Sequence, residues 1–113
     1  MAGNTLSGRR TAAATLQAST VDLVVLTDPG FGVAVENVSG SSAIYFTVGA
    51  PGGPCPVPSV AASTGTVASF CAAASPGAVT TVRHAAQLGS IVQLISSGTP
   101  SYSVSVVGNQ VSA

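Results

Sequence analysis

Residues 31–48 read FGVAVENVSGSSAIYFTV, and this stretch decides the fold. On both sides of the break SGSS at 39–42, apolar residues alternate with small or polar ones, and a period of two places them on one face of a strand. Serine and glycine in the break are typical of a reversing loop. The stretch therefore predicts a β-hairpin with a buried face made of Phe31, Val33, Val35, Ile44, Phe46 and Val48.

Strand patterns continue on both sides of this hairpin, separated by turn signals such as Asp-Pro-Gly at 28–30. The segment 67–74 suits a strand or a short helical turn, and we favour the strand. The segment 11–18 is expected to form an edge strand, although its alanines also suit a helix. The segment 90–96 is expected to be buried on both faces because its apolar run is nearly continuous. The remaining strands are expected at 21–27, with Val21, Leu23 and Val25 on one face, at 79–84, and at 102–107, with Tyr102, Val104 and Val106 on one face.

This spacing of short strands and turns indicates an all-β fold rather than alternating strands and helices. A chain of 113 residues is one domain. We expect a single small β-sandwich, immunoglobulin-like, or a barrel of about seven or eight antiparallel strands. The expected organisation is an extended N-terminal arm at 1–10, the β-domain at 11–107 and a C-terminal tail at 108–113.

The composition is rich in hydrophobic residues and poor in charge, at 46% and 5%, with a formal net charge of zero. Such a chain has neither a basic footprint for nucleic acid nor a polybasic patch for an anionic membrane. The pair Arg9-Arg10 is followed by a segment too polar for an export signal, so a soluble chain is expected. The low charge has two compatible interpretations: a compositional drift toward Ala, Val and Gly, or a surface covered by other subunits.

The cysteines, Cys55 and Cys71, are sixteen positions apart and lie in no C-x-x-C pair. Without an export signal, two reduced thiols are favoured over a disulfide. His84 is the single histidine, so neither a zinc site nor any other metal or cofactor is expected.

The polar residues do not form a recognisable catalytic set. Asp28 is expected to cap a turn, and Asp22 and Glu36 to lie on solvated strand faces. No G-x-S-x-G motif accompanies His84, so an enzyme is not expected. Arg83 is expected to be solvated or to form an interface contact. Residues 37–39 match a glycosylation sequon, which matters only on a eukaryotic secretory route.

Two phrases resemble small virion proteins of tailed bacteriophages that infect actinobacteria. They are ENVSGSSAIYFTV at 36–48 and VQLISSGTPSYSV at 92–104, and together they cover about a quarter of the chain. Gln93 stands where that group usually has lysine, and residues 51–74 depart from the group in their cysteines and proline density.

The resemblance implies a non-enzymatic virion protein, most plainly a capsid decoration (minor capsid) protein on the outside of the shell. The implied partners are the major capsid protein and further copies of this chain, with a trimer favoured. The protein would be made in the bacterial cytoplasm and reside on the capsid surface. The residues expected to make contacts belong to the arm, to the Pro- and Gly-rich loop 49–58 and to strand 79–84, and are Arg9, Arg10, Pro51, Pro54, Pro56 and Arg83.

Other functions are alternatives. A tail or head–tail connector protein needs a barrel around a channel, and the sequence does not exclude it. A receptor- or carbohydrate-binding module at a tail or fibre needs exposed aromatic rings, of which this chain has few. A bacterial surface adhesin lacks its export signal here.

Overall fold

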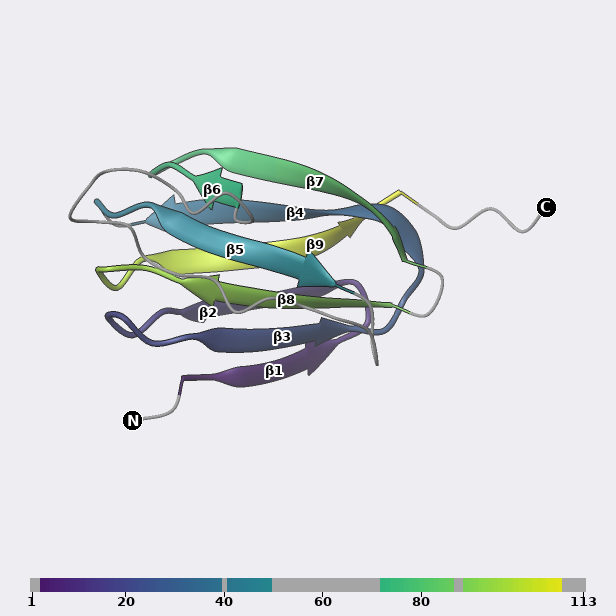
Figure 1. The fold of residues 1–113 in the computed structure, drawn as a ribbon, viewed down its shortest axis with the longest axis horizontal. Coiled ribbons are helices and arrows are strands. Elements are labelled where there is room, and N and C mark those ends of the chain that lie inside the picture. The colour runs from purple at the N-terminus through teal and green to yellow at the C-terminus, as the bar shows by residue number, and fades with distance from the viewer. Residues whose placement is uncertain (1–2, 40, 50–71, 87–88, 109–113) are drawn as a thin grey trace.

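The structure is a computed structural model that describes residues 3–39, 41–49, 72–86 and 89–108; at 84–86 it describes the backbone alone. Within these ranges the chain forms nine strands and no helix (Figure 1). One sheet has five strands in the order β1-β3-β8-β5-β6, and the other has four in the order β2-β9-β4-β7. The strands are β1 Thr5–Gly8, β2 Thr11–Thr15, β3 Asp22–Leu26, β4 Gly30–Ser39, β5 Ile44–Gly49, β6 Ala72–Ala74, β7 Val79–Ala86, β8 Ser90–Ile95 and β9 Ser101–Val107.

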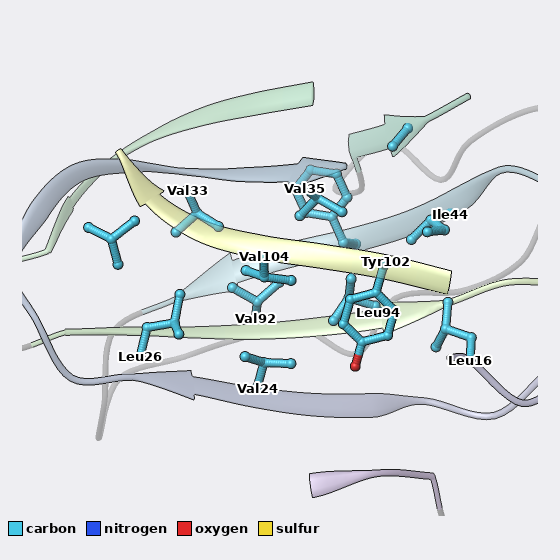
Figure 2. Close-up of a cluster of buried hydrophobic side chains, with 13 residues drawn as sticks. Leu16, Val24, Leu26, Val33, Val35, Ile44, Val92, Leu94, Tyr102 and Val104 are labelled. Atoms are coloured by element: carbon cyan, nitrogen blue, oxygen red, sulfur yellow. The ribbon is translucent and has the colours of Figure 1, made fainter. Parts of the chain in front are cut away.

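The two sheets form a β-sandwich, so the expected fold class is confirmed. Every pairing is antiparallel except that of β1 with β3, which is parallel. Alternate residues of each strand point into the space between the sheets, where Val, Leu and Ile side chains interlock (Figure 2). Each such side chain, when fully buried, contributes about 1.5–3 kcal/mol. The buried cluster consists of Leu16, Val24, Leu26, Val33, Val35, Ile44, Phe46, Ala74, Val92, Leu94, Tyr102, Val104 and Val106.

The prediction that the two halves of 31–48 pair with each other as a hairpin is wrong. β4 lies in the four-stranded sheet and β5 in the five-stranded sheet, so the connection crosses from one sheet to the other. Val33 and Ile44 are both buried, but they approach the core from opposite sheets. An apolar face is needed whether two strands pair or face each other, so the alternation could not separate these arrangements. Phe31 is 51% exposed because it falls where the register between β4 and β7 shifts.

The extended N-terminal arm expected at 1–10 is not confirmed. Residues 5–8 form β1, whose four residues pair in parallel with those of β3 at the edge of the five-stranded sheet. Leu6 packs against the core from this edge strand. A four-residue strand with one large apolar side chain has too short a pattern to be recognised from sequence.

The buried face of β3 is the opposite of the predicted one. Asp22, Val24 and Leu26 are buried, whereas Leu23 and Val25 are partly exposed. In β8 the burial alternates from Ser90 to Leu94 and is then continuous through Ile95 and Ser96, so the expectation that 90–96 is buried on both faces is correct only at the end of this segment. Apolar residues at successive positions of these strands leave the inward face unspecified. The other strands that fall in described residues agree with prediction: β2 is an edge strand, β6 is a strand, and β9 buries Tyr102, Val104 and Val106.

Asn37 holds the end of β4 against the sheet-crossing connection and β6. Its side chain is fully buried, and its Nδ2 donates to the carbonyls of Ser42 and Ala74 at 2.8 and 3.1 Å. Its backbone N–H donates to the carbonyl of Ala78, and its own carbonyl accepts from Gly77. The sequon at 37–39 is therefore closed to glycosylation in the folded chain.

We expect Asn37→Ala to lower the free energy of unfolding by about 2–3 kcal/mol, because two buried carbonyls lose their donor. Ser39→Ala, at an exposed position of the same strand, is the matched control and should change it by less than about 0.5 kcal/mol. Urea unfolding followed by circular dichroism measures both. Equal, small effects in the two variants would contradict the role assigned to Asn37.

Candidate interaction surface

The described residues offer no enclosed site. They contain no pocket and no group of three His, Cys, Asp or Glu side chains able to hold a metal ion. In the same ranges no helix is long and apolar enough to cross a membrane. The described residues instead form a buried polar cluster, a charged cluster at one end of the sandwich, and the outer faces of the two sheets.

A buried carboxylate links the two sheets through the core. Asp22 on β3 is completely buried, and its Oδ2 accepts a hydrogen bond of 2.7 Å from the hydroxyl of Tyr102 on β9. Asn4, just before β1, donates its backbone N–H to Oδ1 at 2.8 Å and its Nδ2 to Oδ2 at 3.0 Å. Three donors thus satisfy a carboxylate that was expected on a solvated face. The sequence signal was the inward position of Tyr102, whose hydroxyl needs a partner when buried.

The environment of Tyr102 keeps its hydroxyl protonated. Burial raises the pKa of Tyr102 well above its ordinary value, and the hydrogen bond to Asp22 and the negative charge of that carboxylate raise it further. The hydroxyl therefore acts as a permanent donor. The cluster is a structural link between the two sheets.

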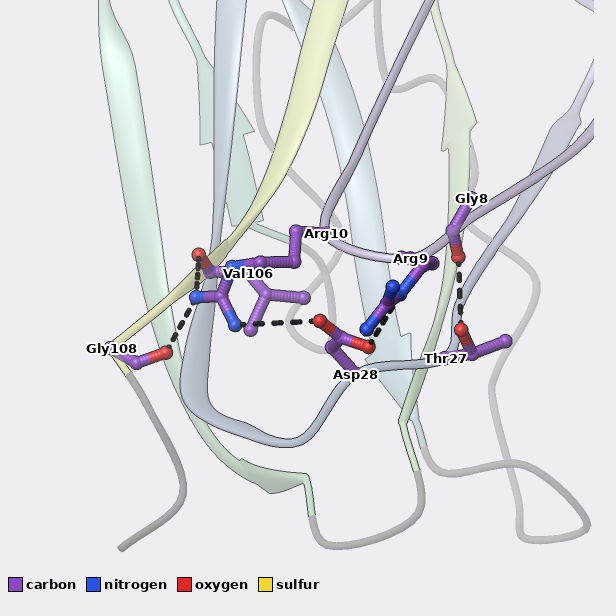
Figure 3. Close-up of polar contacts among 7 residues, drawn as sticks. All are labelled: Gly8, Arg9, Arg10, Thr27, Asp28, Val106 and Gly108. Atoms are coloured by element: carbon purple, nitrogen blue, oxygen red, sulfur yellow. Dashed lines mark hydrogen bonds and ion pairs between the residues drawn. The ribbon is translucent and has the colours of Figure 1, made fainter.

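Arg9 and Arg10 lie between β1 and β2, where the chain passes from one sheet to the other (Figure 3). Arg10 donates to the carbonyls of Gly108 and Val106 at 2.7 and 3.4 Å, and its guanidinium lies 3.8 Å from Asp28. Arg9 reaches Asp28 at 3.4 Å, but its side chain is 85% exposed. Of the two arginines, Arg9 is therefore the one whose guanidinium is free to meet a partner.

The other predicted contact residues lie apart from this cluster. Arg83 is exposed on β7, and no acidic side chain of the described residues lies within ion-pair distance of it. Pro51, Pro54 and Pro56 fall outside the described residues, as do Cys55 and Cys71. The predicted set is thus not brought together into one site by the residues that the structure describes.

The outward side of the four-stranded sheet carries small side chains. We call it the outer face; it consists of Thr11, Ala13, Thr15, Ala34, Glu36, Val79, Thr81, Arg83, Ser101, Ser103, Ser105 and Val107. The cross-strand register aligns them in rows, for example Ala34 with Thr81 and Glu36 with Val79. Glu36 and Arg83 are its two charged residues. Sequence reasoning found both residues but not the surface they share, because that surface depends on which strands are neighbours.

Comparison with known proteins gives little further guidance. No known family matches the sequence, and neither does any curated protein. Among solved structures, the chain is similar to the pre-peptidase C-terminal domain of a collagenase from Bacillus anthracis, determined at 1.0 Å. The likeness covers 91% of this chain and 92% of that one, at 13% identity and a TM-score of 0.44. At those values it supports no statement about function.

Tyr102→Phe should lower the free energy of unfolding at neutral pH by about 1.5–3 kcal/mol, because a hydrogen bond to a charged group is lost. The raised pKa of Tyr102 also predicts a pH dependence. Above about pH 10 the tyrosine ionises in the unfolded chain but stays protonated in the folded one, so stability falls as the pH rises. The difference between wild type and Tyr102→Phe, measured by urea unfolding from pH 7 upward, should shrink above pH 10. A constant difference would contradict this assignment.

The two neighbouring arginines should differ in their effect on stability. Arg10→Ala removes two hydrogen bonds to carbonyls and should cost about 1–2 kcal/mol. Arg9→Ala removes one exposed ion pair and should cost less than about 0.5 kcal/mol. Each variant is the other's control in the same denaturant titration. A larger loss for Arg9→Ala would show that the cluster is described wrongly.

Proposed function

We propose that this chain is a non-enzymatic structural protein of a phage virion, a capsid decoration protein that binds the outside of the major capsid shell. The observation that carries the proposal is the pair of phrases at 36–48 and 92–104. Both resemble segments of small virion proteins of phages that infect actinobacteria.

The two phrases form one unit in this fold. They run from the end of β4 into β5 and from β8 into the first half of β9, and these strands pair as β5 with β8 and β4 with β9. Their loops also meet, since Ser96 donates to the carbonyl of Ala43 at 2.7 Å. The resemblance therefore covers the paired centre of both sheets rather than two scattered matches, which supports its use as a guide to function.

The surface suits a protein that acts by contact. The outer face is built from Ser, Thr, Ala and Val side chains with two charges, and the centres of protein interfaces are depleted in charge. A decoration protein needs area and no reaction chemistry. Because it binds only the assembled shell, it stabilises that shell by mass action, and repetition over many sites multiplies the effect.

The partners follow from this role. They are the major capsid protein and further copies of this chain, with trimers at three-fold positions as the favoured arrangement on the shell. Arg9, with its exposed guanidinium, is a contact to the shell in this proposal, together with the loop at 49–58. The protein is made in the host cytoplasm and resides on the capsid surface.

The rival carbohydrate-binding function receives less support. Such modules stack sugars on exposed aromatic rings. Of the four aromatic residues that the structure describes, Phe46 and Tyr102 are buried, Tyr45 is partly buried and Phe31 is exposed. One exposed ring does not make a stacking platform.

A binding experiment with particles tests the proposal. Shells of the encoding phage, stripped of this protein, are mixed with the purified chain, sedimented, and compared with unassembled major capsid protein and with isolated tails. We expect the chain to sediment with shells alone and to raise the temperature at which they open. Cryo-electron microscopy should then show it on the outer shell. Binding to tails, or absence from native particles by mass spectrometry, would overturn the proposal.

A further inference from the structure

The outer face carries two charges that form no ion pair with any side chain in the described part of the chain. Glu36 on β4 and Arg83 on β7 are both exposed, and neither belongs to an ion pair among the described residues. Arg83 pairs in register with Gly32, and Val79 with Glu36. The two charges are therefore separated by four residues along the strands, or about 14 Å. A negative and a positive charge thus mark opposite ends of one flat surface.

Exposed hydrophobic side chains also lie at both ends of the four-stranded sheet. The large hydrophobic residues exposed in the described ranges all belong to strands of this sheet, and they are Phe31, Val38, Val79 and Val107. Val107 pairs with Gly32, so it lies in the row of Arg83, whereas Val79 lies in the row of Glu36. Each end of the sheet therefore combines one charge with exposed apolar area.

We propose that the outer face docks against the outer face of a second copy of this chain. Contact of one patch with itself requires a two-fold axis, which here lies in the plane of the interface. When the axis passes midway between the two charges, Glu36 of each copy meets Arg83 of the other. The axis then runs perpendicular to the strands, along the row of Ala34 and Thr81, whose small side chains let the sheets approach closely.

The same axis also brings exposed apolar side chains of the two copies together. The end with Val107 and Phe31 in one copy meets the end with Val79 and Val38 in the other. The two ion pairs are equivalent by symmetry, and each gives a partner to a charge that has none among the described residues of its own chain. A parallel stacking of the two faces would instead place like charges opposite each other, so the charge pattern selects one orientation.

The outer face is small for an interface. Four strands at about 4.8 Å spacing and rows spanning about 20 Å give a patch of roughly 400 Å² on each copy. The total of about 800 Å² is below the range of stable specific interfaces and within that of weak, transient ones, so we expect a weak, concentration-dependent pair. This inference concerns the free chain and does not rest on the proposed function; assembly with three-fold symmetry would use other surfaces.

Charge exchange across the outer face tests the pair. Glu36→Arg and Arg83→Glu each place like charges opposite each other twice and should weaken association by about tenfold. The double variant carrying both changes restores opposite charges and should associate like the wild type. Sedimentation velocity from about 10 µM to about 1 mM measures all of them over the range that such an area implies.

Arg9→Glu is the matched control, because it makes the same charge change as Arg83→Glu at an exposed arginine outside the outer face. It should leave the association unchanged, and circular dichroism verifies that every variant is folded. A wild type that stays monomeric throughout overturns the proposal. So do single variants that associate like the wild type, or a double variant that fails to recover. Binding to shells is measured separately, so loss of the pair and loss of shell binding remain distinguishable.

Discussion

The hydrogen bond from Tyr102 to Asp22 is the constraint on which the arrangement of the sheets depends. A carboxylate buried without a cation is costly unless donors satisfy it, and here Tyr102 supplies one donor and Asn4 two. Because Asp22 is on β3 and Tyr102 on β9, this bond fixes the two sheets relative to each other through the core. The donors from Asn4 also fix the start of β1, so the N-terminal residues belong to the sandwich.

Placing β1 in the sheet determines where the charged residues lie. The connection from β1 to β2 must cross between sheets, and it brings Arg9 and Arg10 to the turn that contains Asp28. Arg10 then binds the last carbonyls of β9, which leaves Arg9 as the exposed member. Arg9 and Arg10, which were expected to make contacts from an extended arm, are thus divided between a surface role and a structural role.

The sequence predicts the strands well and their partners poorly. Alternation in β4, β5 and β9 identifies buried faces because a period of two follows from strand geometry alone. The same alternation cannot tell pairing from facing, so the crossing between β4 and β5 was taken for a hairpin. Asp22 was placed on the wrong face because its burial depends on Tyr102, 80 residues away. The outer face was likewise invisible, since its rows join strands that are distant in the chain.

The positions of the charged residues in the fold bear on the second interpretation of the composition, a surface covered by other subunits. Of the six charged residues, Arg9 and Arg10 share the single carboxylate of Asp28 at one end of the sandwich, and Asp22 is satisfied in the core. The remaining two, Glu36 and Arg83, lie on one face. In the proposed pair of copies, Glu36 and Arg83 would fix the orientation of the two sheets. Small neutral side chains alone allow many alignments of two sheets, and the charges select one of them.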